Sequence, residues 1–169
     1  VITQEYIDGD QNDYLYEVQR KYPDRFLCCG LVDVRKKGYL GQAEALIERG
    51  FRGIKLPANR FSLPEGKIPL ASEEMMRMFK EMEAKGIFLS IDLEEGNTQV
   101  GEMKEIISEC PALKIAIGHF GTVTCPDWQE QIKLARNPNV MIESGGITWL
   151  FNQEFYPFKG AIWAIKEAS

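Results

Sequence analysis

A regular recurrence of short, nearly continuous apolar runs constrains the fold of this chain more than any other feature. The runs begin 25, 25, 36, 26 and 26 residues apart and cover 1–6, 26–33, 51–56, 87–93, 113–120 and 139–145. Strands covered on both faces, as in parallel sheets, are apolar throughout, whereas half-exposed strands alternate apolar and polar residues. The sequence therefore predicts six parallel strands.

Between these runs the apolar residues change to a helical period, with stripes at 15–22, 43–47, 75–82, 100–110, 128–135 and 162–165. Ser72 and Asn97 are predicted to cap the third and fourth helices, and the methionines of the third are predicted to pack against the sheet. The longest gap between strands holds a loop rich in Pro, Asn and Ser. Strand and helix alternate six times without an internal repeat or a linker, which predicts a parallel α/β domain.

Two parallel α/β architectures fit this alternation, an open doubly wound sheet and a (β/α)8 barrel. The open sheet usually carries a glycine-rich phosphate-binding turn after its first strand. Here the first strand is followed by "IDGDQND", which lacks the G-x-G-x-x-G spacing, and the later "GHFGT" does not supply it. The absence of this turn favours the barrel.

The composition restricts the classes of partner and location. The 169 residues suit a single domain, and a net charge of −5 without a basic cluster argues against nucleic-acid binding. The apolar runs are far shorter than the roughly 20 residues of a membrane span, and the first residues lack the positive region of a signal peptide. The four cysteines show no metal-binding spacing. We therefore expect a reduced, cytoplasmic protein without a membrane partner.

Polar or ionisable side chains close each of the six runs. They are Gln4 and Glu5, Asp33, Lys55, Asp92, His119, and Glu143 with Ser144. Parallel strands bring their carboxyl ends to one face, and barrel enzymes hold their active sites on that face. Strands also end at polar turns for ordinary reasons, so one such residue would carry little weight. Six in register predict a functional cluster at the mouth of a barrel.

Two of these residues have the most specific patterns. His119 is the only histidine of the chain, and glycines lie close on either side of it, where they let the backbone bend and a ligand approach. Asp92 follows an apolar run, so its carboxylate must be paired, metal-bound or open to the mouth, and Lys55 on the preceding strand is the alternative partner. Trp128 and Trp149 could line the pocket, although packing is the preferred expectation for each.

An ordered set of motifs resembles a known family. The segments "PDRF", "GFRGIKL", "PALKIAIGHFG" and "NPNV" followed by "SG" resemble, in this order, the amidohydrolase-related proteins of amidohydrolase family 2. The resemblance runs along almost the whole chain. It implies a (β/α)8 TIM barrel and a divalent metal, often zinc. Its members hydrolyse lactones or amides, or act as decarboxylases or hydratases on carboxylated substrates.

The resemblance also implies roles for individual residues. His119 matches the histidine at the end of the family's sixth strand. Asp92 stands where many members have the fifth-strand histidine that binds the metal, so an oxygen ligand for zinc or manganese replaces a nitrogen ligand. The family's first-strand H-x-H and eighth-strand aspartate are absent. Residues 1–169 are therefore expected to form a single incomplete barrel domain with strands 2 to 7, six of the eight βα units.

The sequence thus predicts a metal-assisted hydrolase or lyase that acts on a small carboxylated molecule. Asp92 and His119 are the candidate catalytic residues and metal ligands, while Lys55, Glu143 and Ser144 are the candidate substrate-binding residues. A metal-free lactonase or decarboxylase of the same fold stays open as an alternative, as does a degenerate barrel that only binds a ligand or partner. A homodimer is also compatible with the fold.

Overall fold

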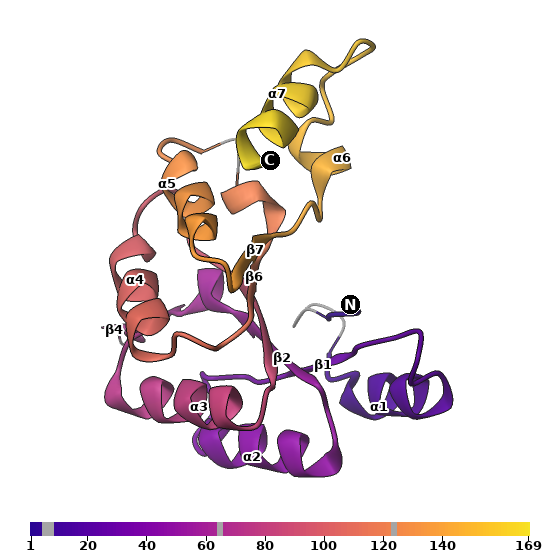
Figure 1. Cartoon of the computed structure of the whole chain (residues 1–169), viewed down its shortest axis with the longest axis vertical. Helices are drawn as coiled ribbons and strands as arrows, with labels where there is room; N and C mark the ends of the chain where they lie inside the picture. The colour runs from indigo at the N-terminus through magenta and orange to yellow at the C-terminus, as the bar shows by residue number, and fades with distance from the viewer. Residues whose placement is uncertain (5–8, 64–65, 123–124) are drawn as a thin grey trace.

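The centre of the fold is a parallel sheet of five strands. The computed structural model describes residues 1–4, 9–63, 66–122 and 125–169 (Figure 1). The strand order is β1-β2-β5-β6-β7, and every neighbouring pair is parallel. The strands are β1 Cys29–Leu31, β2 Gly53–Pro57, β5 Phe88–Asp92, β6 Ile115–Ile117 and β7 Val140–Ile142. This order follows the chain, as in one arc of a barrel.

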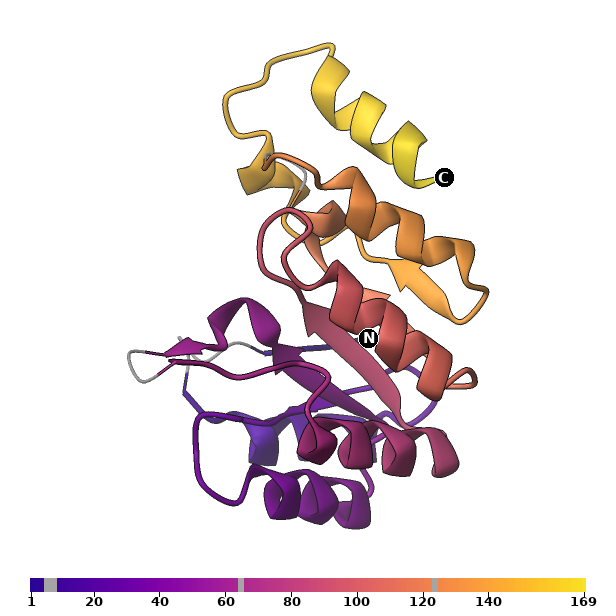
Figure 2. The ribbon, with the colours of Figure 1, turned by 90° about the vertical axis from the view of Figure 1, so that its left-hand side faces the viewer.

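Five helices lie along one side of the sheet (Figure 2). They are α1 Asn12–Lys21, α2 Tyr39–Arg49, α3 Glu73–Ala84, α4 Val100–Glu109 and α5 Gln129–Ile132. The helices α6 Ile147–Leu150 and α7 Lys159–Ala168 follow β7. The described residues also include the short 3-10 helices η2 Ala58–Arg60, η3 His119–Gly121 and η4 Lys133–Arg136, and β3 Ser62–Leu63 pairs with β4 Gly66–Lys67. None of the described helices has the length and apolar character that a bilayer crossing requires.

Five of the six predicted strands are confirmed, at positions close to the predicted ones. The run at 1–6 differs, because its described residues form only an isolated parallel bridge between Ile2 and Cys28. Glu5, one of the predicted polar strand ends, lies outside the described residues. Gln4 is buried and its side chain donates a hydrogen bond to Asn12, which ties the start of the chain to α1.

The predicted helix caps had different outcomes. Ser72 caps α3 as predicted, since its Oγ accepts a hydrogen bond from the backbone N–H of Met75 at 3.3 Å. The prediction for Asn97 is wrong, because α4 begins at Val100 after Gln99 and has no side-chain cap. The buried side chain of Gln99 instead accepts from the N–H of Glu94 and donates to the carbonyl of Ala58. These contacts fix the end of the loop and delay the helix.

The main core lies between the sheet and the helices. Alternate strand residues point to this side and are completely buried, among them Ile54, Leu56, Leu89, Ile91, Ile115 and Ile117. They pack against α3 and α4, and Met75, Phe79 and Met82 of α3 are fully buried there. The predicted packing of the methionine stripe is therefore confirmed, since a 3.6-residue helical period brings these side chains to one face.

A smaller core holds the C-terminal part of the chain together. Phe120, Trp128, Leu150 and Ala164 form it, so it joins η3, α5, α6 and α7. Trp128 is only 4% exposed and lies edge-on against Trp163 of α7. This cluster fixes α6 beside the turn that follows β6, which is the turn that carries His119.

Candidate functional site

Three of the predicted site residues meet at the carboxyl ends of adjacent strands. Lys55 of β2 forms an ion pair with Asp92 of β5, with 2.6 Å between Nζ and Oδ2. His119 follows β6, and its Nε2 lies 3.6 Å from Oδ1 of the same aspartate. The Lys55 and Asp92 side chains are 4% and 3% exposed, while that of His119 is 32% exposed. Asp92 thus bridges two basic side chains, one internal and one open to solvent.

The strand register explains why these residues meet. Pro57 is opposite Asp92 in the parallel ladder between β2 and β5, so Lys55 begins two residues below and reaches up along the same face. On the other side of Asp92, the N–H of Gly118 donates to the carbonyl of Ile91. A Cβ at Gly118 would lie 2.2 Å from Oδ1 of Asp92, so only glycine leaves room for the carboxylate.

The turn that carries His119 has an uncommon backbone. His119, Phe120 and Thr122 have φ of 59°, 49° and 59°, the left-handed region that non-glycine residues rarely adopt. Such conformations cost on the order of 1–3 kcal/mol each and persist where the surroundings determine them. Here the N–H of Phe120 donates to the carbonyl of Glu143, and the Phe120 ring is buried in the smaller core. The turn is therefore held from both sides, as is common at functional sites.

Both ring nitrogens of His119 face oxygen acceptors. Nδ1 lies 3.0 Å from the carbonyl oxygen of Gly145, and Nε2 faces the Asp92 carboxylate. A neutral imidazole has only one N–H, so one lone pair would face an oxygen. The arrangement is favourable when both nitrogens carry protons, or when Nδ1 carries one and a cation lies at Nε2. Consistently, the interaction with Asp92 raises the pKa of His119 above its usual range, although burial opposes the rise.

Two further side chains lie around this cluster, and sequence reasoning missed the first of them. Ser90 lies opposite Lys55 in the ladder and is 1% exposed, and its Oγ has no hydrogen-bond partner in the described part of the chain. The period of two along the strand, which puts Ser90 on the face of Asp92, was an available signal. The second is Trp149, for which packing was preferred over a place in the pocket. It is 55% exposed, and its ring lies 5.7 Å from that of His119, centroid to centroid.

The remaining candidates lie around the same end of the sheet. Glu143 is half-buried just beyond β7, on the strand face that carries Met141, and Ser144 is exposed. The contacts described above for Lys55, Asp92 and His119 do not involve either side chain. The structure thus places these two residues near the cluster without bringing them into it.

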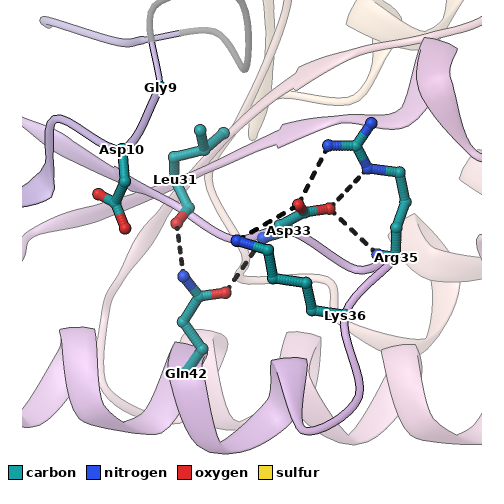
Figure 3. Close-up of a pocket in the computed structure, with 7 residues that line it drawn as sticks. All are labelled: Gly9, Asp10, Leu31, Asp33, Arg35, Lys36 and Gln42. Carbon is teal, nitrogen blue, oxygen red and sulfur yellow. Dashed lines mark hydrogen bonds and ion pairs between the residues drawn. The ribbon is translucent and has the colours of Figure 1, made fainter.

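Asp33 belongs to a separate pocket at the end of β1 (Figure 3). Arg35 binds its carboxylate with two hydrogen bonds, of 2.7 Å from Nε and 3.0 Å from the terminal guanidinium nitrogen. Burial raises the pKa of Asp33, but these bonds and the charge of Arg35 outweigh it, so the pKa falls below its usual value. The pocket has a volume of about 300 Å³ and is lined also by Gly9, Asp10, Leu31, Lys36 and Gln42. Asp33 is thus held by local cations, away from Asp92.

The fit of a divalent metal can be tested on Asp92 and His119. Zinc binds carboxylate oxygens and imidazole nitrogens at about 2.0–2.2 Å, so one ion could reach both Oδ1 and Nε2 across their 3.6 Å separation. The Nδ1 contact to the Gly145 carbonyl is the outer contact that metal-binding histidines usually make. In the described ranges, no group of three or more His, Cys, Asp or Glu side chains gathers around an ion site. Two ligands therefore fit, and any others must come from elsewhere.

Comparison with solved structures shows the same fold in other proteins. A protein described as a probable 2-pyrone-4,6-dicarboxylic acid hydrolase, from Acinetobacter baumannii with citric acid bound, matches 98% of this chain and 60% of its own at 18% identity and a TM-score of 0.70. An amidohydrolase from Burkholderia multivorans with bound zinc matches 94% of this chain and 58% of its own at 15% identity and a TM-score of 0.66.

A third match is 2,6-dihydroxybenzoate decarboxylase from Rhizobium, with 16% identity and a TM-score of 0.55 over 93% of this chain and 61% of that one. This chain therefore spans about 60% of the length of these three proteins. The partial TIM barrel that the sequence predicted is confirmed by the parallel sheet and by these matches.

The sequence was also compared with curated proteins and with family profiles. No curated protein matches it significantly. The profile of the amidohydrolase family matches residues 1–169, which is the whole chain. A match of this extent, together with the fold, shows that the chain belongs to the amidohydrolase family.

Proposed function

We propose that this chain carries part of the active site of an amidohydrolase-type hydrolase or lyase that acts on a small carboxylated substrate. The observation that supports this most is the cluster of Lys55, Asp92 and His119 at the carboxyl ends of β2, β5 and β6. Barrel enzymes hold their reacting groups at this end. The citrate bound to the Acinetobacter relative supports a carboxylated ligand.

His119 is the residue that we assign to the reacting bond. Its side chain is 32% exposed, so it can contact a substrate while Asp92 and the Gly145 carbonyl fix the orientation of the ring. An imidazolium in this position can donate a proton to a leaving oxygen or nitrogen, or to a ring carbon during decarboxylation, which contributes about 10²–10⁴-fold in comparable cases. Asp92 orients His119 and stabilises its charge.

The three candidate substrate-binding residues have different support. The Lys55 ammonium is buried against Asp92, which supports a role in balancing the charge of that carboxylate, and a substrate carboxylate would have to displace this partner. Glu143 and Ser144 lie beyond β7 beside the His119 turn, where they could contact polar groups of a substrate. We therefore place Lys55 behind Asp92 and the other two at the rim of the site.

A divalent ion, for which zinc is preferred to manganese, would be held by Asp92 and His119 as two of its ligands. It would lower the pKa of a bound water to about 7 and so supply a nucleophile at neutral pH. The zinc in the Burkholderia relative supports this version of the proposal. In this version Asp92 and the Nε2 of His119 serve as ligands, while the Gly145 carbonyl orients the ring.

The metal-free alternative is favoured by one specific observation. Both nitrogens of His119 face acceptors and its pKa is raised, so a second proton satisfies the site by itself. In that form His119 acts as an acid toward the substrate, and Lys55 balances the charge of Asp92. The two versions share their residues and differ in whether a chelator affects turnover.

The first test is turnover of two probe substrates, 2-pyrone-4,6-dicarboxylate for hydrolysis and 2,6-dihydroxybenzoate for decarboxylation. We expect one of them to be consumed, and we expect His119→Ala to lower kcat by at least about 100-fold with an unchanged circular dichroism spectrum. Lys80→Ala is the control, because Lys80 is an exposed partner of Glu109 on the helical side. Equal turnover by the His119→Ala variant would refute the assignment.

Chelation and metal analysis then distinguish the metal-dependent enzyme from the metal-free enzyme. If EDTA stops turnover, zinc restores it and the purified chain carries about one equivalent of metal, the ion belongs to the mechanism. Turnover that persists in EDTA supports the metal-free enzyme. A folded chain that consumes neither probe, with or without added zinc, contradicts both versions and supports a barrel that only binds a ligand.

A further inference from the structure

Trp149 is a large aromatic side chain whose ring contacts that of His119, and the packing of α6 turns it outward. Ile147 and Leu150 of this helix pack in the smaller core with Phe120 and Trp128. Trp149 lies on the same short helix but is 55% exposed. A single exposed aromatic is normal on a protein surface, so exposure alone carries no argument. The neighbours of the Trp149 ring are more informative than its exposure.

The indole lies against the imidazole of His119. The ring centroids are 5.7 Å apart and the planes meet at 63°, an edge-on arrangement that is favourable for aromatic pairs. Both rings are partly exposed, so they form a continuous aromatic surface beside the Lys55–Asp92–His119 cluster. A flat molecule that reaches His119 from solvent would meet the indole as well.

The backbone fixes the relation between the two rings. A Cβ at Gly146 would lie 2.3 Å from Nε1 of Trp149 and 3.0 Å from Nδ1 of His119, so this glycine lies against both. Its φ of 75° is left-handed, which glycine adopts without strain. The preceding residue, Gly145, supplies the carbonyl that binds His119. The turn formed by Gly145 and Gly146 therefore positions both the imidazole of His119 and the indole of Trp149.

We infer that Trp149 is the aromatic wall of the substrate site and selects planar, conjugated carboxylates over saturated ones. This rests on the proposed function for the position of the site, and it goes further by naming the class of substrate. A conjugated ring offers a flat face that can stack on the indole of Trp149, with its carboxylate directed toward His119. A saturated ring of similar size has the same charge but a puckered surface and no π-face, so it packs poorly on the indole.

The test uses two acids of equal charge, benzoate and cyclohexanecarboxylate, and the fluorescence of the whole chain. The chain has three tryptophans, of which Trp128 is buried and Trp163 is 45% exposed and packed edge-on against Trp128. We expect benzoate to cause a saturable change in fluorescence and to bind about tenfold more tightly than cyclohexanecarboxylate, which corresponds to about 1.4 kcal/mol. Trp163→Phe is the matched control and should retain the change and the ratio.

Trp149→Phe should remove the benzoate-dependent fluorescence change, because the reporting indole is gone, while calorimetry still detects binding by the remaining ring. Trp149→Ala should reduce the affinity ratio of the two acids to near one. Retention of the full ratio by Trp149→Ala, retention of the fluorescence change by Trp149→Phe, or absence of saturable binding of benzoate to the folded wild-type chain would each overturn the inference.

The proposed function fails in a different way. If His119→Ala leaves turnover unchanged, or if no probe is turned over at all, the catalytic assignment is lost. The selectivity of the Trp149 wall for benzoate would still be measurable under those outcomes, because it is read from binding and needs no reaction.

Discussion

Toward the carboxyl ends of β2 and β5, the two faces of the sheet are equally buried and chemically different. On the helix side, Ile54, Leu56, Leu89 and Ile91 are 0% exposed and belong to the main core. On the other side, Lys55, Ser90 and Asp92 are, as whole residues, 3%, 1% and 3% exposed. Neighbouring residues along one strand therefore share the same degree of burial but not the same kind of environment.

The difference separates the face that stabilises the fold from the face that we propose for the chemistry. Apolar burial contributes roughly 25 cal/mol per Å² removed from water, so the apolar side chains on the helix side stabilise the fold. A buried ion pair is often no more stable than apolar residues of similar volume, because both charges lose their hydration. Lys55 and Asp92 are therefore hard to explain by stability, and the buried Ser90 hydroxyl on the same face, which has no hydrogen-bond partner among the described residues, adds to the cost. This cost supports the role in the reaction that we propose for this face.

The largest expected effect comes from breaking the polar face at Asp92. Asp92→Ala leaves the Lys55 ammonium buried without its partner, so we expect the free energy of unfolding to fall by about 3–5 kcal/mol and turnover to be lost. The double variant Lys55→Met with Asp92→Leu should recover most of the stability and none of the turnover. Urea denaturation and the probe assay measure the two quantities.

Leu89→Ala is the matched control on the opposite face of the same strand. It should lower the free energy of unfolding by about 2–5 kcal/mol through the cavity that it leaves, with turnover per folded molecule unchanged. If the double variant stayed as unstable as Asp92→Ala, or if Leu89→Ala lost turnover while folded, the division between the two faces would not hold.

A smaller effect is expected at Gly118, where the polar face is most crowded. The Cβ of Gly118→Ala would lie 2.2 Å from Oδ1 of Asp92, so the carboxylate must move away from His119. We expect about 1–3 kcal/mol of destabilisation and a fall in kcat. Gly101→Ala in α4 is the control, since its Cβ meets nothing within 4 Å, and it should be neutral or stabilising by up to about 1 kcal/mol. Similar results for the two variants would contradict the crowding that the structure shows.

The smallest expected effect is a pH dependence at the boundary between the polar face and solvent. Asp92 raises the pKa of His119 in the folded chain above the ordinary value of 6.5. The ionised ring therefore adds stability that is fully present below about pH 6.5 and is lost as the pH rises through the folded-state pKa. Since His119 is the only histidine, its proton signals in NMR give this pKa directly.

His119→Gln supplies the comparison for the pH effect. From about pH 5.5 to about pH 9 the wild-type chain should lose more stability than this variant, whose side chain does not titrate. A measured pKa at or below 6.5, or an equal loss in both proteins, would show that Asp92 does not hold the imidazolium. Asp92→Asn should then be tested, because it should bring the pKa of His119 back toward its ordinary value.

Much of this arrangement could be read from the sequence, because local patterns record it. Nearly continuous apolar runs mark strands that are covered on both faces, and five of them are strands of the sheet. The polar residues that close these runs predicted that Lys55, Asp92 and His119 would lie at one end. A cap that depends on adjacent residues only, such as Ser72, was also predictable. Asn97 was not, since the long-range contacts of Gln99 decide where α4 begins.

The sequence by itself determined the alternation of strand and helix, the family and the polar end of the sheet, since each follows from the order and period of side chains along the chain. Only the tertiary structure decided that Asp92 is shared between Lys55 and His119, that Ser90 joins their face and that Trp149 turns outward against the histidine. Those relations depend on strand register, on the room left by Gly118 and Gly146, and on a second core that orients α6. Such contacts join residues far apart in the chain, and no local pattern specifies them.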